Sequence, residues 1–334
     1  MKYFVLVLLL FTRLIGEEHL KIATYNVENL FDLQRSGHEY REYIPNSKSQ
    51  WNLKNYNIKL KNIAKVIHDM DADILALQEI ESLQALKDLR FTLKRQGVYY
   101  PYYKIANYKE TTVKVALLSK VPFIYTHEVA VQSSYKYRNI LEAKFTINKR
   151  DLYLLVNHWK SKAGPESMRI VSAKKLLKRV KELGEKKNII LLGDFNSDYQ
   201  ENILFIRKRR HNDTDGITGI NDILGTKEHT KTAYYTKLEN YEFYNLWYDT
   251  TKEKRYSYIF RGKKEAMDSI LISSSLLNKE GISYRHHSIE SFNKKYLRKG
   301  KAIYRWQMSR KKPRVHRGKG YSDHLAVIAE FVVH

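Results

Sequence analysis

The chain has 334 residues, of which 43% are hydrophobic, which is enough for a sizeable core in one large or two ordinary domains. Its 60 Lys and Arg against 36 Asp and Glu give a formal net charge of +24, which favours association with polyanions such as nucleic acid or an anionic membrane and offers little to a neutral substrate. The absence of cysteine excludes disulfides, thiolate metal sites and lipidated-cysteine anchors.

The first residues are typical of a secretory signal peptide. A single lysine is followed by an unbroken apolar run over residues 3–11, which is too short to span a bilayer. Because Arg13 interrupts the apolar stretch, we place the cleavage site only between Gly16 and Leu20 and take residues 1–18 as the leader. An uncleaved membrane tether is the alternative. The expected location is therefore secreted or periplasmic.

Strands outnumber helices in the rest of the chain. Alternation and runs of β-branched and aromatic residues predict strands over 21–27, 74–77, 98–105, 113–119, 121–131, 139–147, 151–157, 188–192, 255–260, 267–273 and 325–333. Helical spacing predicts helices over 54–70, 82–95 and 165–183. Because helices fall between groups of strands and no linker divides them, we expect a layered α/β domain with helices on the sheet faces.

One segment stands out by its charge. Residues 291–322, called the basic segment from here on, contain twelve Lys or Arg and no Asp or Glu. Glycines and Pro313 interrupt any regular pattern, so we expect a long loop.

Five polar clusters follow predicted strands, and side chains at strand ends often carry function. They are Asn26, Glu79, His158, the turn 193–196 and the turn 322–324. Each could have a structural role, such as capping a turn, starting a helix or filling the core. Together they supply what phosphodiester hydrolysis requires, which is oxygen ligands for a hard cation and a base for water. We expect Mg²⁺, with Mn²⁺ or Ca²⁺ substituting or assisting. Zinc is disfavoured, because the chain has neither a cysteine nor a His-Glu-x-x-His pattern.

The segments IATYNVENLFD, DILALQEIES, LVNHWKSK, IILLGDFNSD, AMDSILIS and YSDHLAVIAEF, in this order, resemble the motif series of the endonuclease/exonuclease/phosphatase superfamily, and most closely its secreted deoxyribonuclease I-like nucleases. The resemblance implies an α/β fold in which helices flank a two-layer β-sandwich, with the site at the strand ends between the sheets. It also implies one catalytic domain over 19–334, with the basic segment as an insertion. Two departures, Lys114 for a common glycine and Ala326 for a common proline, remove no functional group.

The resemblance also assigns roles to individual residues. It implies metal ligation by Asn26, Glu79, Asp194, Asn196 and Asp323. It implies catalytic roles for His158, Asp194, Asn196, Asp268 and His324. The two histidines would flank the scissile phosphate, and the Asp268 carboxylate would orient His324 and favour its protonated form.

Three further residues match the family pattern less closely. Arg138 stands at the start of a strand where the deoxyribonuclease group places a phosphate-contacting arginine, and Asn26 would contact the same phosphate. Residues 108–110 resemble a stretch in which the glutamate, here Glu110, supports the first catalytic histidine, with Tyr108 near the substrate phosphate. The alternatives are a solvated arginine and an exposed loop carboxylate.

The basic segment leads us to predict nucleic acid as the substrate. It begins after the strand that carries Asp268 and ends at Asp323, so both anchors approach the site if the family fold holds. Its cations would bind phosphates, and Tyr296, Tyr304 and Trp306 could stack on bases. Basic residues 207–210 add to the attraction. The expected activity is cleavage of DNA by a largely sequence-nonspecific endonuclease that leaves 5′-phosphate ends, with RNA left open.

Two alternatives remain at this point. Basic and aromatic residues together, as over 304–306, also suit an anionic membrane surface, so a sphingomyelinase- or inositol-phosphatase-like phosphodiesterase is the first. The second is a nucleic-acid-binding protein that keeps the fold without catalysis. The complete set of metal and histidine positions favours an enzyme over the latter.

Overall fold

The computed structural model describes residues 18–204, 212–226 and 238–334. The predicted leader and the basic residues 207–210 therefore lie outside the described residues. Within those ranges no helix is both long enough and apolar enough to cross a membrane.

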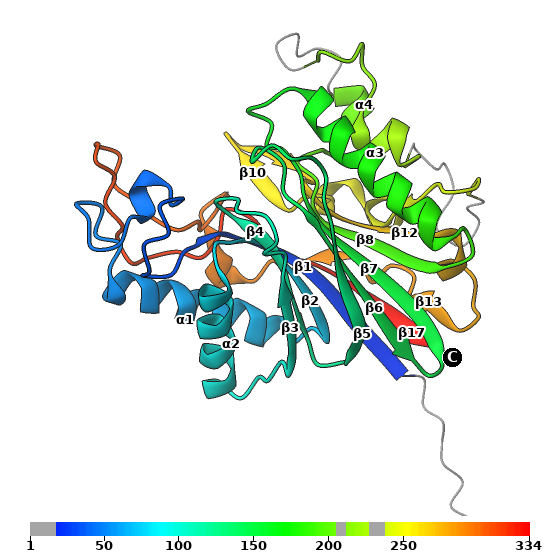
Figure 1. Ribbon diagram of the computed structural model, residues 1–334, viewed down its shortest axis with the longest axis horizontal. Helices are drawn as coiled ribbons and strands as arrows, with labels where there is room; N and C mark the ends of the chain where they lie inside the picture. Colours follow the sequence, from blue (N-terminus) through cyan, green and yellow to red (C-terminus); the bar gives the residue numbers. More distant parts are fainter. Residues whose placement is uncertain (1–17, 205–211, 227–237) are drawn as a thin grey trace, which may run out of the picture.

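Two β-sheets form the centre of the described fold (Figure 1). The first has the order β13-β17-β1-β2-β4-β3, with β14 also paired to β17. Its strands are β1 (Glu18–Leu30), β2 (Ile74–Ile80), β3 (Tyr102–Ile105), β4 (Lys114–Ser119), β13 (Ile282–Tyr284), β14 (Glu290–Ser291) and β17 (Val327–Val333). The second has the order β5-β6-β7-β8-β12-β9. Its strands are β5 (Phe123–Val129), β6 (Ile140–Ile147), β7 (Arg150–His158), β8 (Asn188–Asp194), β9 (Tyr244–Asn245) and β12 (Asp268–Ile272).

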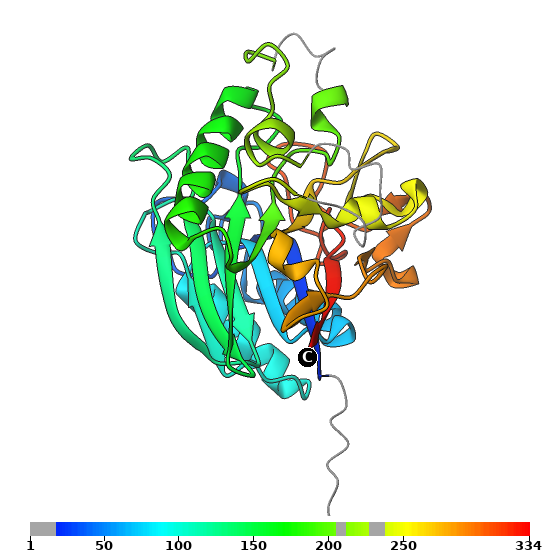
Figure 2. The ribbon, with the colours of Figure 1, turned by 90° about the vertical axis from the view of Figure 1, so that its right-hand side faces the viewer.

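Helices cover the outer face of each sheet, and Figures 1 and 2 show the resulting layers. The longer helices are α1 (Leu53–Met70) and α2 (Leu83–Arg95), which pack on the first sheet, and α3 (Glu166–Leu183), which packs on the second. The short elements that matter below are α4 (Glu201–Leu204), the 3-10 helices η1 (Arg41–Tyr43) and η7 (Lys295–Leu297), and the hairpins β10–β11 (Tyr258–Phe260, Lys263–Glu265) and β15–β16 (Arg298–Lys299, Ala302–Ile303). The predicted α/β fold with a helix-flanked β-sandwich is confirmed.

The burial of β8 shows why its sequence is apolar throughout. Ile190 and Leu192 point into the core between the two sheets, whereas Ile189 and Leu191 point into the core beneath α3. A strand with both faces covered has no solvent side, so the alternation of apolar and polar residues disappears. Fully burying one such side chain contributes roughly 1.5–3 kcal/mol. This packing holds the end of β8, where Asp194 lies, on a rigid support.

The strand directions bring the motif residues to one edge of the sandwich. β1 runs parallel to β2, and β7 runs parallel to β8, so the carboxyl ends of all four strands meet there. β12 runs antiparallel to β8, which places Asp268 opposite Asp194 in the register. The end of β8 has no room for a side chain at Gly193, because a Cβ there would lie 2.0 Å from the Asn157 carbonyl oxygen of β7.

Most of the basic segment is a long loop, as predicted, but it also holds short regular elements and part of it is buried. It contains η7 and the hairpin β15–β16, and Trp306 is only 2% exposed, within the core that also holds α1. The Lys59 Nζ donates to the Tyr321 carbonyl at 2.9 Å, and the Asn62 amide donates to the Gly320 carbonyl at 2.7 Å, so α1 fixes the end of the segment. Apolar residues spaced between the cations allow this packing. Two smaller differences are that β3 begins at Tyr102 and that β11, which pairs with β10 inside the predicted strand 255–260, was not predicted.

Candidate active site

The strand ends surround a cavity of about 700 Å³. Among the predicted site residues, those that line it are Glu79, Arg138, His158, Asp194, Asn196, Asp323 and His324. Asn26 and Asp268 are buried directly behind the lining, and each is hydrogen-bonded to a residue that lines it. Residues that are far apart in sequence, from Asn26 to His324, thus form one site.

Asn26 links two carboxylates of the site. Its amide nitrogen lies 3.2 Å from Glu79 Oε1 and 3.0 Å from Asp194 Oδ2, while its oxygen accepts a hydrogen bond from the Glu28 amide at 3.0 Å. Glu79 reaches this position because it adopts a left-handed conformation, with φ 67°, where the register of β2 against β4 shifts. Such bulges redirect side chains near active sites. Asn26 therefore acts as a hydrogen-bond donor to both carboxylates here, and its contact with a metal stays a prediction.

Glu79 and Asp194 fit a hard divalent cation. Burial, together with the nearby Asp268 charge, raises the pKa of Asp194 to about 7, and burial raises the pKa of Glu79 as well, with Asp323 adding to the effect. The charge of His324 acts in the opposite direction on both carboxylates, and burial outweighs it. A bound cation would reverse the shift. Two carboxylates, which leave the other coordination positions to water and substrate, are a common way for proteins to hold Mg²⁺.

A second grouping of potential ligands overlaps the first. Asp194, Asp268 and His324 offer ligand atoms within 4.8 Å of one another. However, His324 Nδ1 and Asp268 Oδ2 lie 2.6 Å apart and are hydrogen-bonded to each other, and among the described residues no group is hydrogen-bonded to the other oxygen, Asp268 Oδ1. Asp194 belongs to both groups, so we place the cation on the side of Asp194 that faces Glu79.

His324 is held as a cation. Burial favours its neutral form, but the Asp268 carboxylate outweighs burial and raises the pKa of His324 well above its ordinary value. The turn before it is fixed to β1, because Ser322 Oγ donates to the Asn26 carbonyl at 2.6 Å and accepts from the His324 amide at 3.1 Å. The Tyr258 ring packs 4.8 Å from the His324 ring. This arrangement leaves Nε2 of His324 as the proton-bearing atom beside the cavity.

His158 has the opposite preference. Burial lowers its pKa well below the ordinary value, and the charges of Arg138 and His324 act in the same direction. Its Nε2 lies 3.6 Å from Asp194 Oδ2 and 3.8 Å from Glu79 Oε1. The site therefore combines a neutral imidazole with a cationic one.

The predicted support of His158 by Glu110 is not found. Glu110 lies on an exposed loop, and its carboxylate lies 3.0 Å from His38 Nε2. Among the described residues no group is hydrogen-bonded to His158 Nδ1. Tyr108 is 81% exposed and does not line the cavity, so its predicted phosphate contact is not seen either. Local sequence similarity placed these residues, and the loop between β3 and β4 turns them outward.

Arg138 and Asn196 lie where phosphate could be bound. The Arg138 guanidinium and the Asn196 amide both donate to the Trp159 carbonyl, at 3.1 Å and 3.2 Å, which holds them side by side in the cavity wall. The backbone N–H of Asn196 also donates a hydrogen bond to Asp194 Oδ1 at 2.9 Å. A guanidinium next to an amide is a suitable donor pair for phosphate oxygens.

Several residues of the site were not identified from sequence. Tyr40, Lys162, Tyr258 and Phe260 line the cavity. Glu28 and Arg305 lie next to it and hold Asp323: Arg305 lies 3.1 Å from Asp323 Oδ2 and donates through Nε to Glu28 Oε1 at 2.8 Å. Glu28 stands inside the first quoted motif, which was a usable signal. Arg305 could not be separated by sequence from the other cations of the basic segment.

Residues 21–332 match the family model described as "Endonuclease/Exonuclease/phosphatase family". Among curated proteins, tyrosyl-DNA phosphodiesterase 2 of Danio rerio is 25% identical over 152 residues, which are 44% of this chain and 39% of that protein. The chain thus spans about two fifths of the length of that curated relative.

Solved structures share the fold across nearly the whole chain. D. rerio TDP2 complexed with single strand DNA product has a TM-score of 0.58 at 16% identity, covering 94% of this chain and 98% of that chain. A protein of the same family from Bacteroides thetaiotaomicron has a TM-score of 0.57 at 14% identity, covering 96% and 99%. A mannosyl-6-phosphatase from that organism has a TM-score of 0.54 at 15% identity, covering 94% and 99%. At these identities the likeness shows the fold and leaves the substrate open.

Proposed function

The chain belongs to the endonuclease/exonuclease/phosphatase family, and from this premise we propose that it is a metal-dependent phosphodiesterase that cleaves DNA internally with little base preference. The observation that carries the proposal is the pairing of a cationic His324 with a neutral His158 across a cavity that also holds Glu79 and Asp194. Phosphodiester hydrolysis needs a donor to the charged oxygens and an acceptor for the proton of water, and these groups supply both.

A divalent cation, Mg²⁺ by preference, would be held by Glu79 and Asp194, with Asp323 and Asn196 adjacent. When bound, it would neutralise charge on the phosphate and lower the pKa of water. Asn26 keeps the two carboxylates together through its amide group.

The remaining side chains act on the substrate. The Nε2 proton of His324 would be donated toward the phosphate oxygens or the leaving oxygen, while neutral His158 and Asp194 accept from the attacking water. Arg138 would bind a non-bridging oxygen, because it lines the cavity and is oriented by the Trp159 carbonyl. The ends produced would carry 5′-phosphates, as the family resemblance implies.

Nucleic acid is favoured by charge. All cations of the basic segment except Arg298 are exposed. In the described parts of the chain, Arg305 is the only one of these cations that forms an ion pair with a carboxylate. Unpaired cations at this density give strong and salt-dependent binding of phosphate chains. The curated relative is named a tyrosyl-DNA phosphodiesterase, which supports DNA as the polymer.

A membrane surface is favoured less by the structure than by the sequence. The sequence indication came from residues 304–306, but Trp306 is buried, and its indole nitrogen lies 2.7 Å from His316 Nδ1. Arg305 is engaged by Glu28 and Asp323. Stacking of Trp306 on a base is excluded by the same burial.

A phosphodiesterase acting on tyrosyl-DNA is the second candidate, and the specific observation in its favour is the similarity to the D. rerio protein of that name. For the place of action we keep the proposal that the leader directs the chain to a secreted or periplasmic location. N-terminal sequencing of the mature protein tests this, because β1 begins at Glu18 and cleavage far beyond that residue would remove its pairing with β17.

The test of the proposed function uses three substrates in parallel: supercoiled plasmid, a tyrosine-linked oligonucleotide and phospholipid vesicles, each with Mg²⁺ or a chelator. Nicking that requires Mg²⁺ and is lost in Glu79→Gln supports the endonuclease. Release of tyrosine with intact plasmid would move the assignment to the second candidate. Phosphate or head-group release from vesicles with both DNA substrates intact would overturn a nucleic-acid function.

A further inference from the structure

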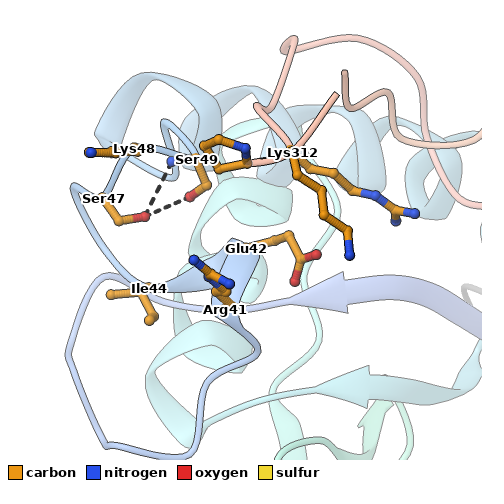
Figure 3. A pocket seen from close by; sticks show the side chains of 9 residues that line it. Arg41, Glu42, Ile44, Ser47, Lys48, Ser49 and Lys312 are labelled. Carbon is orange, nitrogen blue, oxygen red and sulfur yellow. Dashed lines mark hydrogen bonds between the residues drawn. The ribbon is translucent and has the colours of Figure 1, made fainter. Parts of the chain in front are cut away.

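A second cavity, of about 430 Å³, lies outside the catalytic one. One wall is formed by residues 41–49, before α1, and the other by residues 312–314 of the basic segment. Figure 3 shows Lys312 facing Arg41 and Glu42 across this pocket. We refer to it as the basic pocket.

The charge of the basic pocket is strongly positive. Its lining contains four cations, Arg41, Lys48, Lys312 and Arg314, against the single carboxylate of Glu42. All four cations are exposed, and no ion pair joins any of them to a carboxylate in the described parts of the chain. Ser47 and Ser49 add hydroxyl groups, whose oxygens lie 2.8 Å apart. Hydroxyls and unpaired cations around one hollow are the groups that bind phosphate oxygens.

The two walls are joined rigidly. The His316 amide donates to the Ser49 carbonyl at 2.9 Å, and His316 Nε2 lies 2.9 Å from the Glu42 carbonyl. The His316 ring also packs 4.9 Å from Tyr43 and 4.7 Å from Trp51. A pocket whose walls are fixed in this way presents its cations without a further cost of ordering the backbone.

The position of the basic pocket relates it to the catalytic cavity. Tyr40 lines the catalytic cavity, and the next residue, Arg41, lines the basic pocket. Consecutive residues at the start of η1 therefore line the two hollows. A strand that passes out of the catalytic cavity beside Tyr40 would bring its next phosphates to Arg41 and then to the opposite wall.

We propose that the basic pocket is a phosphate-backbone subsite, which binds a nucleic-acid strand beyond the scissile bond. The inference rests on the proposed function, because it takes the polymer cleaved in the catalytic cavity as its ligand. It requires a substrate several nucleotides long, and a single phosphodiester that fills only the catalytic cavity gains nothing from it. Binding here contributes affinity and register and reads no bases.

The test compares variants of equal charge change. Lys312→Gln/Arg314→Gln removes two cations from the basic pocket. Lys174→Gln/Lys178→Gln removes two exposed cations from α3, on the outer layer of the second sheet (Figure 1), and serves as the matched control. Glu42→Gln removes the opposing carboxylate. All five side chains are at least partly exposed, and thermal unfolding verifies that each variant folds as the wild type does.

Binding of a fluorescent 30-nucleotide duplex is measured by anisotropy with chelator present, across a salt series. The pocket variant is expected to raise Kd roughly tenfold and to reduce the slope of log K against log salt by about 1–2. The α3 control should change both far less, and Glu42→Gln should tighten binding. With Mg²⁺, kcat/KM for thymidine 5′-p-nitrophenyl phosphate should be the same in all variants.

Each possible failure has a distinct reading. If the pocket variant and the α3 control weaken binding equally, only net charge matters and the subsite is overturned. If wild type cuts duplex while the pocket variant binds duplex as wild type does, the subsite is also wrong but the proposed function stands. If wild type hydrolyses the small ester and neither binds nor cuts nucleic acid, the proposed function fails and the subsite with it.

Discussion

Arg305 lies 3.1 Å from the Asp323 carboxylate and joins the basic segment to the turn that carries His324. The same guanidinium binds the buried Glu28, whose other oxygen accepts from the Trp306 amide at 2.9 Å. Glu28 lies two residues after Asn26 in β1. Arg305 therefore connects the β1 side of the active site to the turn that carries Asp323. An insertion that is rich in cations thus has a structural role in the site as well as an electrostatic one.

We predict that Arg305→Ala lowers kcat by about tenfold or more, because the loss of the charge-assisted contacts to both carboxylates frees Asp323 and leaves Glu28 buried without its arginine partner. Arg305→Lys should recover only part of the activity, since a lysine keeps the charge but lacks the fork. Steady-state kinetics on duplex DNA separates the effects. A change confined to KM would show that Arg305 only attracts substrate.

Replacement of Asp268 should change the pH dependence of catalysis. Asp268 raises the pKa of His324, so the cationic form persists into alkaline solution. In Asp268→Asn this support is lost, and the alkaline limb of kcat should move to lower pH, with kcat at pH 8 reduced by about 10²–10⁴. Asp71→Asn, at an exposed carboxylate, is the control. An alkaline limb that stays in place would show that His324 does not act as the acid.

Metal binding should compete with protons at Asp194. In the metal-free protein the pKa of Asp194 is raised to about 7, so the folded state holds a proton that the unfolded state has released, and stability falls as pH rises from about 4 through 7. Mg²⁺ replaces that proton. Saturating Mg²⁺ should therefore raise Tm more at pH 8 than at pH 6, by several degrees, since binding at a hundred times Kd contributes about 2.7 kcal/mol.

The control for the metal prediction is Glu79→Gln, which removes one ligand and should abolish most of the Mg²⁺ effect on Tm. Calorimetry or a dye-based melt provides the readout, independent of activity. An equal effect of Mg²⁺ at both pH values, or an unchanged effect in the variant, would place the cation elsewhere.

The extent to which sequence predicted this site follows from where each residue lies. Glu79, Asp194 and His324 follow or precede strands with a clear pattern, and strand directions then bring them together, so their convergence could be expected. Glu110 could not be placed, because it belongs to a loop whose path depends on tertiary contacts such as that between Glu110 and His38. The ordered packing of Trp306 was hidden for a similar reason, since its partners Trp51 and Lys59 are some 250 residues away in sequence.

The position of Glu110 in the structure differs from the role that the family resemblance implies for it, and the two lead to different expectations for a Glu110 variant. Because its carboxylate is exposed and paired with His38, Glu110→Gln should leave kcat within about twofold of the wild-type value, as is usual for surface substitutions. Measurement of kcat on plasmid for Glu110→Gln beside His158→Gln tests this. A loss as large as that of His158→Gln would mean that the loop moves Glu110 to His158 when substrate binds.

His316 should make the attachment of the basic segment sensitive to acid. Its Nδ1 accepts from the Trp306 indole and its Nε2 donates to the Glu42 carbonyl, so only the neutral ring fits, and burial lowers its pKa to about 4. The unfolded chain takes up this proton near pH 6.5 and the folded chain does not. Stability from this group is thus complete above pH 6.5 and is lost between 6.5 and 4, to an extent of roughly 3 kcal/mol.

Urea unfolding of wild type and His316→Phe at pH 7, 5.5 and 4.5 measures this contribution. The free energy of unfolding of the variant should fall less steeply with acid than that of wild type, whatever its value at pH 7. His38→Asn, at an exposed histidine, should follow the wild-type curve. Parallel curves for wild type and His316→Phe would show that the ring accepts a proton without loss of its contacts.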